Sequence, residues 1–538
     1  AYLPIDPAFP AERIARILDV GKPFLVITEI GLKDRIPSQF PVLVVDEQRD
    51  DEPGPLEDAR PRILPRQLAY TIFTSGSTGW PNGVAITHEA LLNILESFEQ
   101  RPGITADDVL VSVTTLSFDI ATLEILLPLV TGAILHLASR AQALDGVELA
   151  RVLRESNATV MQATPATWRM LLAAEFRPAS RFRAWCGGEA LPPDLAVSLL
   201  KAGFDLWNLY GPTETTIWSS CKQIRDGSEA PTIGTPVART QLYVLDSAGN
   251  KLPSEIIGDL WIGGVGLSRG YCEEPALTAD RFRPDAFSDT PGARIYRTGD
   301  LACLLPSGEI EFHGRNDFQV KVDGYRIELG DIESALAGIA EVAHAAAAVQ
   351  SDAAGRRFLV GYVVSKDGMP IDPEYLRLSL SGKLPDYMIP SRWVMLAALP
   401  LTPNRKLDRK ALPAGDLVPA AAPVVAMVEA RNPVEEALAE MWKDAFGLGQ
   451  IGVTADFFEL GGHSLLATQI HVRITRRFQT DLRLRDLFRH RTIESLAQLL
   501  TAQESRPGAA EKIARAWLTI RRMTPEQKKA LAARAQRA

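Results

Sequence analysis

The sequence predicts an α/β protein that carries a smaller α+β part and ends in an all-helical domain, and three observations lead to this prediction. Up to about residue 313, short β-rich runs such as PFLVIT, AYTIFT and VLVSVTT alternate with amphipathic stretches such as GVELARVLRESN. Such alternation is typical of helices packed on largely parallel sheets. Between about 240 and 313, LYVLDSAGNKL and GDLWIGGVGLSRGY contain hairpin turns and glycine breaks, which indicate a small β unit. Helical patterns replace strands after residue 432.

The division into domains follows from length and from shifts in composition. At 538 residues the chain is too long for one hydrophobic core. The stretch AGDLVPAAAPVVAMVEA is rich in Ala, Pro and Val and predicts a semi-stiff linker. We therefore expect five segments: a large α/β subdomain at 1–316, a small α+β subdomain at 317–413, the linker at 414–431, a four-helix domain at 432–503 and a basic tail at 504–538.

The last part of the chain has strong helix signals. Asn432 is placed to cap a helix and Pro433 to occupy its first turn, with Leu438 and Trp442 on one apolar face. Counted from Glu511, the tail carries eight Lys or Arg against two acidic residues, with apolar side chains at helical spacing. This pattern predicts a surface helix or a connector between modules, and a docking element is the alternative.

Composition and charge argue against several classes of protein. Hydrophobic residues at 46%, charged residues at 23% and a formal net charge of −8 describe an ordinary globular protein with no electrostatic case for nucleic acid. The sequence has no apolar run near the ~20 residues that span a membrane and no basic-then-apolar leader. Its four cysteines are far apart and form no CxxC pair. This argues against a disulfide framework and a zinc knuckle, and a reducing cytoplasm fits best.

A glycine-rich loop stands between a strand and a helix in YTIFTSGSTGWPNGVAITHEAL, residues 70–91. Backbone N–H groups approach phosphate oxygens closely only where no Cβ intervenes, so Gly76 and Gly79 are suited to hold an anion. Hydroxyl donors come from Thr74, Ser75, Ser77 and Thr78. The GxxxxGK[ST] spacing of the P-loop is absent, which argues against that nucleotide fold, and a plain surface loop is the alternative.

The phrase TSGSTGWPNGV resembles the phosphate loop of the acyl- and aminoacyl-adenylate-forming enzymes. The chain also has NLYGPTETT, YRTGDL, GRNDFQVKVDGYRIELGDIE and PLTPNRKLDRKAL in that family's order and at its spacing. Together with DFFELGGHSLL at 456–466, these phrases resemble an adenylation domain fused to a peptidyl carrier domain of a nonribosomal peptide synthetase, up to about residue 503. The opening AYLPIDP resembles a segment well inside that domain, so we expect its first strands and helices to be missing.

The resemblance implies that an amino-acid carboxylate attacks the α-phosphate of ATP and yields an aminoacyl adenylate and pyrophosphate. Tyr210 would then stack on adenine, Thr213 would touch phosphate and Glu214 would help to hold Mg²⁺. Asp300 would accept hydrogen bonds from the ribose hydroxyls, with Arg315 nearby. The remaining ATP contacts implied by the resemblance are Thr74, Ser75, Gly76, Ser77, Thr78, Gly79, Gly188, Glu189, Asn208 and Gly211.

Two positions in the family pattern bear on the rate of adenylation. Lys406 in NRKLDRK is expected to reach between the substrate carboxylate and the α-phosphate and to offset the charge that builds there, with a solvated surface charge as the alternative. At position 82 the family usually has lysine, and here Asn82 stands instead. If that lysine assists the departing pyrophosphate, adenylation is slower in this protein; if it lies in solvent, nothing changes.

Asp119 matches the acidic residue that pairs with the substrate ammonium in this family. The other pocket positions matched by the resemblance are Ile120, Leu123, Gln162, Trp185, Gly187, Leu209, Ile217 and Trp218. Two tryptophans, four aliphatic side chains and a glutamine leave little room, so a small substrate is expected, and the set resembles that of glycine-activating domains. Trp185 stands where leucine is expected, which leaves alanine open.

Ser464 in DFFELGGHSLL matches the serine that receives 4'-phosphopantetheine from CoA through a separate transferase, although a serine before a helix is most often only an N-cap. Asp317 matches the hinge about which the family's small subdomain swings, and the segment around Lys321 and Gly324 would line the thiol tunnel.

Further expected partners are condensation and next-module domains of the synthetase and a small helper protein. The rival functions are an acyl-CoA ligase and a non-catalytic carrier or scaffold fragment.

Overall fold

A seven-stranded sheet is the largest sheet in the computed structural model of the chain, with the strand order β11-β10-β9-β8-β7-β5-β6. Five strands run parallel: β5 (Val109–Ser112), β6 (Ile134–Leu137), β7 (Val160–Ala163), β8 (Arg183–Cys186) and β9 (Asp205–Tyr210). Two are antiparallel: β10 (Ser220–Ile224) and β11 (Thr235–Pro236). The intervening helices are α3 (Ile120–Thr131), α4 (Arg140–Ala143), α5 (Gly146–Glu155), α6 (Pro165–Ala173) and α7 (Pro193–Lys201). The predicted α/β class is confirmed.

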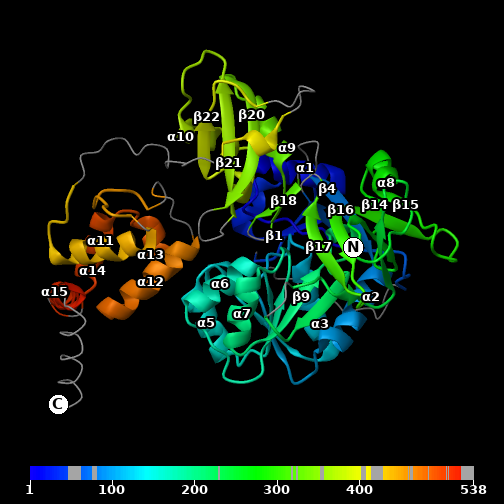
Figure 1. Ribbon diagram of the computed structural model, residues 1–538, viewed down its shortest axis with the longest axis horizontal. Helices are drawn as coiled ribbons and strands as arrows, with labels where there is room; N and C mark the ends of the chain where they lie inside the picture. Colours follow the sequence, from blue (N-terminus) through cyan, green and yellow to red (C-terminus); the bar gives the residue numbers. More distant parts are fainter. Residues whose placement is uncertain are drawn as a thin grey trace. The chain divides into compact units, whose positions relative to one another are not determined.

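The structure describes residues 1–46, 62–74, 81–227, 231–316, 319–322, 325–351, 357–400, 407–413, 428–446, 448–457, 460, 464–480, 482, 484–504, 506 and 508–522. The chain forms two compact units (Figure 1). One holds Ala1–Arg140, Val152–Trp168 and Arg177–Ala414, and the other holds Ala141–Arg151, Arg169–Phe176 and Gly415–Ala538. In the described part of the chain, no helix has both the length and the apolar character needed to cross a membrane.

A second sheet carries the glycine-rich loop. It has three strands in the order β14-β4-β3, namely β3 (Leu68–Thr74), β4 (Asn82–Thr87) and β14 (Gly270–Tyr271). Strands β3 and β4 are antiparallel, and Thr74, the last residue of β3, pairs with Asn82, the first residue of β4. Helix α2 (His88–Phe98) follows, and the Thr87 side chain caps it by accepting a hydrogen bond from the backbone N–H of Ala90.

The predicted small β unit is a five-stranded antiparallel sheet. Its strands are β12 (Thr240–Leu245), β13 (Gly258–Gly264), β15 (Phe282–Pro284), β16 (Arg294–Leu304) and β17 (Ile310–Arg315). Strand β16 is central, because it pairs with β13, β15 and β17. The other elements before residue 316 are α1 (Ala11–Gly21), β1 (Val26–Thr28), η1 (Ile30–Arg35), β2 (Val42–Val44), η2 (Glu99–Gly103), η3 (Thr213–Thr215) and α8 (Pro275–Arg281).

The small α+β part begins with a hairpin of β18 (Gln319–Val322) and β19 (Tyr325–Glu328). A three-stranded sheet follows, formed by β20 (Val342–Ser351), β21 (Arg357–Ser365) and β22 (Arg392–Met395). The other elements are α9 (Leu329–Ala337), α10 (Pro373–Ser381), η4 (Asp386–Met388) and η5 (Arg409–Ala411). A separate hydrophobic core forms here around Ile332, Leu336 and Val363, all fully buried.

The C-terminal unit is helical, with α11 (Pro433–Phe446), α12 (Ser464–Phe478), α13 (Leu484–Arg489), α14 (Ile493–Ala502) and α15 (Ala509–Arg522). The predicted linker at 414–431 lies outside the described residues up to 427. Trp442 and Ile470 are fully buried in the core of the helical unit. Over 509–522 the basic tail forms α15, whose Ala514 and Leu518 join this core, while Arg521 pairs with Asp444 of α11 at 2.7 Å. The four helices expected from the sequence are therefore joined by a fifth.

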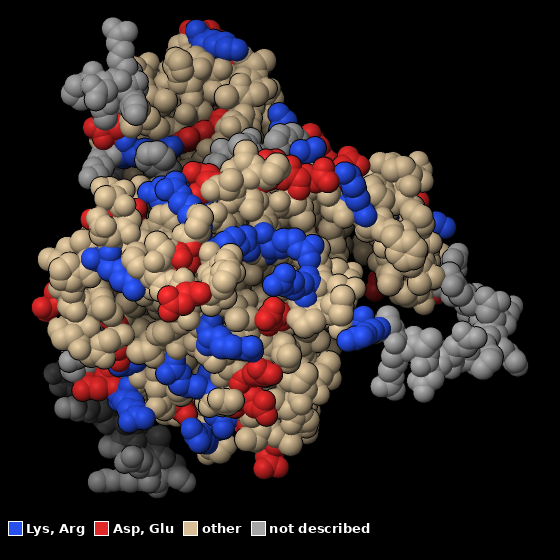
Figure 2. Space-filling view, turned by 90° about the vertical axis from the view of Figure 1, so that its right-hand side faces the viewer, with Lys and Arg blue, Asp and Glu red and all other residues tan. Residues whose placement is uncertain are grey.

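Figure 2 shows acidic and basic side chains interspersed over one face of the molecule. Some of the exposed ion pairs join neighbours in sequence, such as Arg377 with Glu374, and others join distant positions, such as Arg239 with Glu96. In the described part of this face, neither sign of charge is present alone.

Leu518→Ala tests whether α15 belongs to the helical core. Leu518 is 5% exposed, so its truncation is expected to cost about 2–4 kcal/mol and to increase hydrogen exchange in α11 and α15 of the full chain. Ile520→Ala is the matched control, because Ile520 on the same helix is 40% exposed and its loss should change exchange little. Equal protection in the two variants would contradict this packing.

Candidate active site

The predicted site residues gather at one edge of the seven-stranded sheet. Tyr210 is the last residue of β9, Gln162 lies next to the end of β7, and Gly187 follows β8 directly. Asp119 precedes α3, which comes after β5. Because β5, β7, β8 and β9 are parallel, their carboxyl ends meet at the same edge of the sheet, and ligands of open α/β sheets bind there.

Asp119 is buried, with 3% of its surface exposed, and its side chain does not cap its own helix. Burial raises the pKa of Asp119 to about 6, a hydrogen bond with Thr213 opposes this increase, and the nearby charge of Glu214 adds to it. The Tyr70 hydroxyl lies buried without a hydrogen-bond partner among the described residues. Burial is the main cause of its raised pKa, and the charge of Asp119 raises that pKa further. A carboxylate in this setting gains strongly from a cation.

Trp218 and Gln162 form the polar contact inside the predicted substrate pocket. The Trp218 indole N–H donates to Oε1 of Gln162 at 2.7 Å. Nε2 of Gln162 donates to the carbonyl of Ile120 at 3.1 Å and to Oε1 of Glu124 at 3.2 Å. Both ends of the buried amide are therefore occupied, which fixes its orientation and holds the indole in one position.

Glu124 is a functional neighbour that was not identified from the sequence. It is 1% exposed, and burial raises its pKa. Its carboxylate accepts hydrogen bonds from the Ser112 hydroxyl at 2.8 Å and from the hydroxyl and N–H of Thr114 at 2.7 and 3.1 Å. The available signal was an acidic residue inside the otherwise apolar helix IATLEILLPLVT. Through Gln162, this carboxylate supports the wall of the pocket.

Gly187 lets the Trp218 ring approach the backbone. A Cβ at this position would lie 2.4 Å from the ring and 2.9 Å from the carbonyl oxygen of Leu209. Trp185 is fully buried and meets Phe98 edge to face at 5.5 Å. The apolar pocket positions all fall in one hydrophobic cluster: Ile120, Leu123, Trp185, Leu209, Ile217 and Trp218. The structure thus brings the predicted pocket residues together in a tightly packed region.

The residues predicted to bind the nucleoside also contact one another. The Tyr210 hydroxyl donates to Oδ2 of Asp300 at 2.5 Å, and Arg315 donates to Oδ1 at 2.7 Å. The Tyr210 ring lies 6.2 Å from the ring of Phe312. Asn208, predicted to contact ATP, donates through Nδ2 to the carbonyl of Thr232 at 2.8 Å. Two predicted glycines have backbone reasons for being glycine: Gly188 has φ +84°, and a Cβ on Gly211 would lie 2.5 Å from the carbonyl oxygen of Ile217.

Glu214 is fully buried and ionised. Burial would raise its pKa, but the charge of Arg326 and a hydrogen bond from the Tyr271 hydroxyl bring it below the ordinary value. Arg326 of β19 donates to both carboxylate oxygens at 2.8 Å, and Tyr271 donates at 2.8 Å. Sequence reasoning did not single out Arg326 or Tyr271. Residue 326 lies inside the GYRIE phrase, which was the signal available for it.

Lys321 on the same hairpin also faces these charges. Burial lowers its pKa, while Asp300 and Glu189 act in the opposite direction, and the charge of Lys321 in turn lowers the pKa of Asp119. The β18–β19 hairpin therefore supplies two cations to the site.

Three groups of predicted residues lie outside the described residues: Ser75, Gly76, Ser77, Thr78 and Gly79; Asp317; and Lys406. Ser464 is the first residue of α12.

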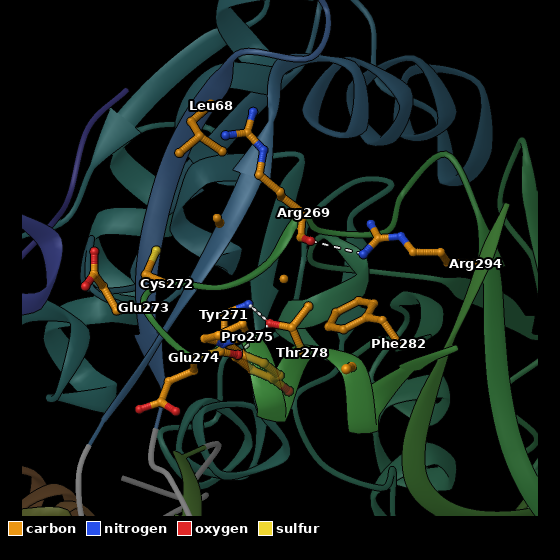
Figure 3. A pocket seen from close by; sticks show the side chains of 13 residues that line it. Leu68, Arg269, Tyr271, Cys272, Glu273, Glu274, Pro275, Thr278, Phe282 and Arg294 are labelled. Carbon is orange, nitrogen blue, oxygen red and sulfur yellow. Dashed lines mark hydrogen bonds between the residues drawn. The ribbon is translucent and has the colours of Figure 1, made fainter. Parts of the chain in front are cut away.

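A hollow beside β14 and α8 is distinct from these residues (Figure 3). It is lined by Arg269, Tyr271, Cys272, Thr278 and Arg294, among others, and by none of the residues predicted to bind ATP or substrate. Tyr271 borders this hollow and also donates to Glu214, so it separates the two regions.

Comparison with known proteins agrees with this geometry. Residues 1–272 match the AMP-binding enzymes, residues 331–406 match the AMP-binding enzyme C-terminal domain, and residues 436–500 match the phosphopantetheine attachment site. A dimodular nonribosomal peptide synthase of Bacillus subtilis (strain 168) is 40% identical over 521 residues, which cover 96% of this chain and 22% of that protein. Phosphinothricin tripeptide synthetase PhsC of Streptomyces viridochromogenes is 38% identical, over 94% of this chain and 46% of its own.

Solved structures give the same result. A holo nonribosomal peptide synthetase protein with adenylation and PCP domains, bound to a vinylsulfonamide inhibitor, superimposes with a TM-score of 0.75 and 28% identity over 94% of this chain and 84% of its own. A four-domain nonribosomal peptide synthetase bound to AMP and glycine has a TM-score of 0.56 and 38% identity, over 94% of this chain and 37% of its own.

The chain spans less than half the length of both curated relatives. The resemblance found in the sequence is confirmed. The chain belongs to the AMP-binding enzymes, as an ATP-using, AMP-forming adenylation domain of the nonribosomal peptide synthetase type joined to a carrier domain with a phosphopantetheine attachment site.

Proposed function

We propose that this segment activates glycine as its adenylate and loads it onto the carrier domain at Ser464, with alanine as the second candidate. The observation that carries the proposal is the packing of the Trp218 ring on Gly187, fixed by Gln162, in the cluster beside Asp119. This packing leaves little space next to an ammonium-binding carboxylate. The similar structure that is 38% identical is bound to AMP and glycine, which supports the same assignment.

In the adenylation step, Asp119 pairs with the substrate ammonium and leaves the substrate carboxylate free to attack the α-phosphate. Asp300 accepts hydrogen bonds from the ribose hydroxyls and Tyr210 packs on the base, while Lys406 offsets the charge that forms on the phosphate. The buried carboxylate of Glu214 and the Thr213 hydroxyl are hard oxygen donors that suit Mg²⁺. That ion would neutralise phosphate charge when bound.

In the loading step, the phosphopantetheine arm on Ser464 supplies the thiol that accepts the aminoacyl group. Ser464 begins α12, and a helix N-terminus favours the phosphate of the arm. The contact of Arg326 with Glu214 supports a role for the β18–β19 hairpin in this step, since the small subdomain then faces the site with that hairpin. Asp317 is the proposed hinge. A phosphopantetheinyl transferase, neighbouring synthetase domains and a small helper protein are the proposed partners.

ATP–pyrophosphate exchange with a panel of amino acids tests the substrate. Glycine is expected to exceed alanine in kcat/KM by about 5- to 150-fold, because an added methyl group in a packed pocket costs roughly 1–3 kcal/mol. Alanine at the level of glycine would overturn the assignment. Exchange that depends on a fatty acid would favour an acyl-CoA ligase, and no exchange with any amino acid would favour a non-catalytic carrier fragment.

The pKa of Asp119 predicts a specific pH dependence. Only the carboxylate binds the ammonium, and its pKa of about 6 lies above the ordinary 3.8. The kcat/KM for the amino acid, which reports the free enzyme, should therefore fall about tenfold per pH unit below pH 6 and level off above it. Asp119→Asn should be weakly active with no such step. A profile that stays level down to pH 5 in the unmodified protein would contradict the role given to this residue.

Arg326→Ala separates the two half-reactions. Removal of one partner of a buried ion pair costs about 3–5 kcal/mol, so the orientation that faces the β18–β19 hairpin toward Glu214 loses an anchor. We expect single-turnover loading of labelled amino acid onto the carrier to slow at least about tenfold. The rate of ATP–pyrophosphate exchange should not fall. Arg377→Ala, which removes an exposed pair with Glu374 in the same subdomain, is the control. An equal fall in both half-reactions would count against this role.

A further inference from the structure

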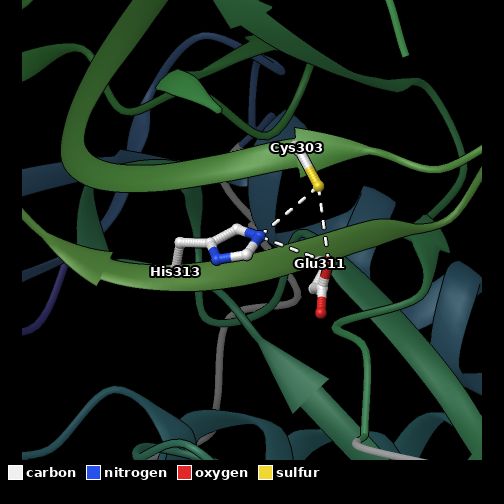
Figure 4. Close-up of side chains that lie close together, drawn as sticks. All are labelled: Cys303, Glu311 and His313. Carbon is white, nitrogen blue, oxygen red and sulfur yellow. Dashed lines mark hydrogen bonds and ion pairs between the residues drawn. The ribbon is translucent and has the colours of Figure 1, made fainter. Parts of the chain in front are cut away.

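Cys303, Glu311 and His313 form a cluster on the β16–β17 hairpin that the adenylation chemistry does not use (Figure 4). Cys303 of β16 pairs directly with Glu311 of β17, and His313 lies two residues further along β17. Side chains of a strand alternate between faces, so Glu311 and His313 project from the same face. Among the described residues, no other group of three or more His, Cys, Asp or Glu brings its ligand atoms as close together.

The distances in this cluster fit a tetrahedral metal ion. Sγ of Cys303 lies 3.4 Å from Nε2 of His313 and 3.5 Å from Oε2 of Glu311, and Nε2 lies 3.2 Å from Oε2. With ordinary zinc bond lengths and tetrahedral angles, the separations would be about 3.6 Å for sulfur to nitrogen, 3.6 Å for sulfur to oxygen and 3.4 Å for nitrogen to oxygen. Each observed separation is within about 0.2 Å of that geometry, so binding needs almost no rearrangement.

We propose that these three side chains form a binding site for a divalent transition-metal ion, with Zn²⁺ as the best match. A thiolate, an imidazole and a carboxylate together are the donors that zinc prefers, whereas Mg²⁺ and Ca²⁺ prefer oxygen alone. On binding, Cys303 gives its thiol proton to solvent and the sulfur becomes a ligand. Water fills the fourth position, because the side chains of His313 and Glu311 are 31% and 41% exposed and the cluster opens to solvent.

The position of the cluster gives the ion a role in the fold. Strands β16 and β17 also carry Asp300 and Arg315, the pair assigned to the ribose. Cys303 and His313 lie three and two residues from this pair along their strands. Besides the Asp300–Arg315 ion pair, a bound ion would add a further side-chain link between the two strands, near an irregularity in their register between Asp300 and Ala302. The ion therefore acts as a cross-link that steadies the nucleoside end of the hairpin, outside the reaction itself.

Co²⁺ titration of the full chain tests the site. Ser464→Ala is used as the background, so that a phosphopantetheine thiol does not compete. We expect one Co²⁺ per chain, with the near-ultraviolet thiolate-to-cobalt absorption and the intense visible bands of tetrahedral Co²⁺, displaced by one equivalent of Zn²⁺. Cys303→Ser should abolish the thiolate band, and His313→Leu should weaken Zn²⁺ binding at least about tenfold. Cys272→Ser is the matched control, since Cys272 lies outside the cluster, and should bind as the parent does.

A second measurement keeps the proposal open to contradiction if one variant folds poorly. Equimolar Zn²⁺ should raise the melting temperature of the Ser464→Ala chain and leave that of Cys303→Ser unchanged. The same thiolate band in Cys303→Ser would place the metal elsewhere and overturn the proposal. So would the absence of any tetrahedral Co²⁺ spectrum in the parent, since the cluster would then be an ordinary hydrogen-bonded group.

Discussion

Two carboxylates, Asp119 and Glu214, are buried at the site and are unequally balanced by nearby charge, and this inequality is the constraint on which the site depends. They lie at the same edge of the seven-stranded sheet. Burial is the largest cause of the raised pKa of Asp119, and the charge of Glu214 raises it further. Glu214 is neutralised by Arg326, whereas for Asp119 the hydrogen bonds from Thr213 and the Ile120 backbone and the charge of Lys321 do not offset burial, so its pKa stays raised. The fold thus satisfies one acid and leaves the other in need of a cation, which an amino-acid ammonium can supply.

This imbalance has a cost in stability with a defined pH window. The pKa of Asp119 is raised from 3.8 to about 6, so the folded state holds its proton more tightly than the unfolded state. Stability contributed by the protonated form is present below pH 3.8 and is lost as pH rises toward 6, by on the order of 3 kcal/mol. At neutral pH, a bound ammonium would recover this energy. Binding groups often lower the stability of a protein while its site is empty, because they are placed for the ligand and not for the fold.

Much of this arrangement could be predicted from the sequence, because the residues lie in contiguous phrases. YGPTE placed Tyr210 and Glu214, and YRTGDL placed Asp300, so the contacts of Tyr210 and Arg315 with Asp300 were within reach. The supporting contacts were not, since they join distant positions: Glu124 and Gln162 are 38 residues apart, and Arg326 and Glu214 are 112 apart. No local pattern reports such pairs. The hydrogen bond from Asn208 to the carbonyl of Thr232, 24 residues away, was likewise outside the reach of a local phrase.

The loop after β9 carries both Glu214 and Trp218, and it does so at the expense of backbone strain. Thr216 and Ile217 have φ of 64° and 68°, a region that β-branched residues avoid and that costs about 1–3 kcal/mol each. The Thr216 hydroxyl donates to the carbonyl of Gly266 at 2.6 Å, and Trp218, which follows Ile217, donates from its indole to Gln162. These two anchors hold the turn from both sides. The strain places Glu214 and Trp218 on one short segment, so a change that loosens Trp218 also displaces the carboxylate assigned to the metal.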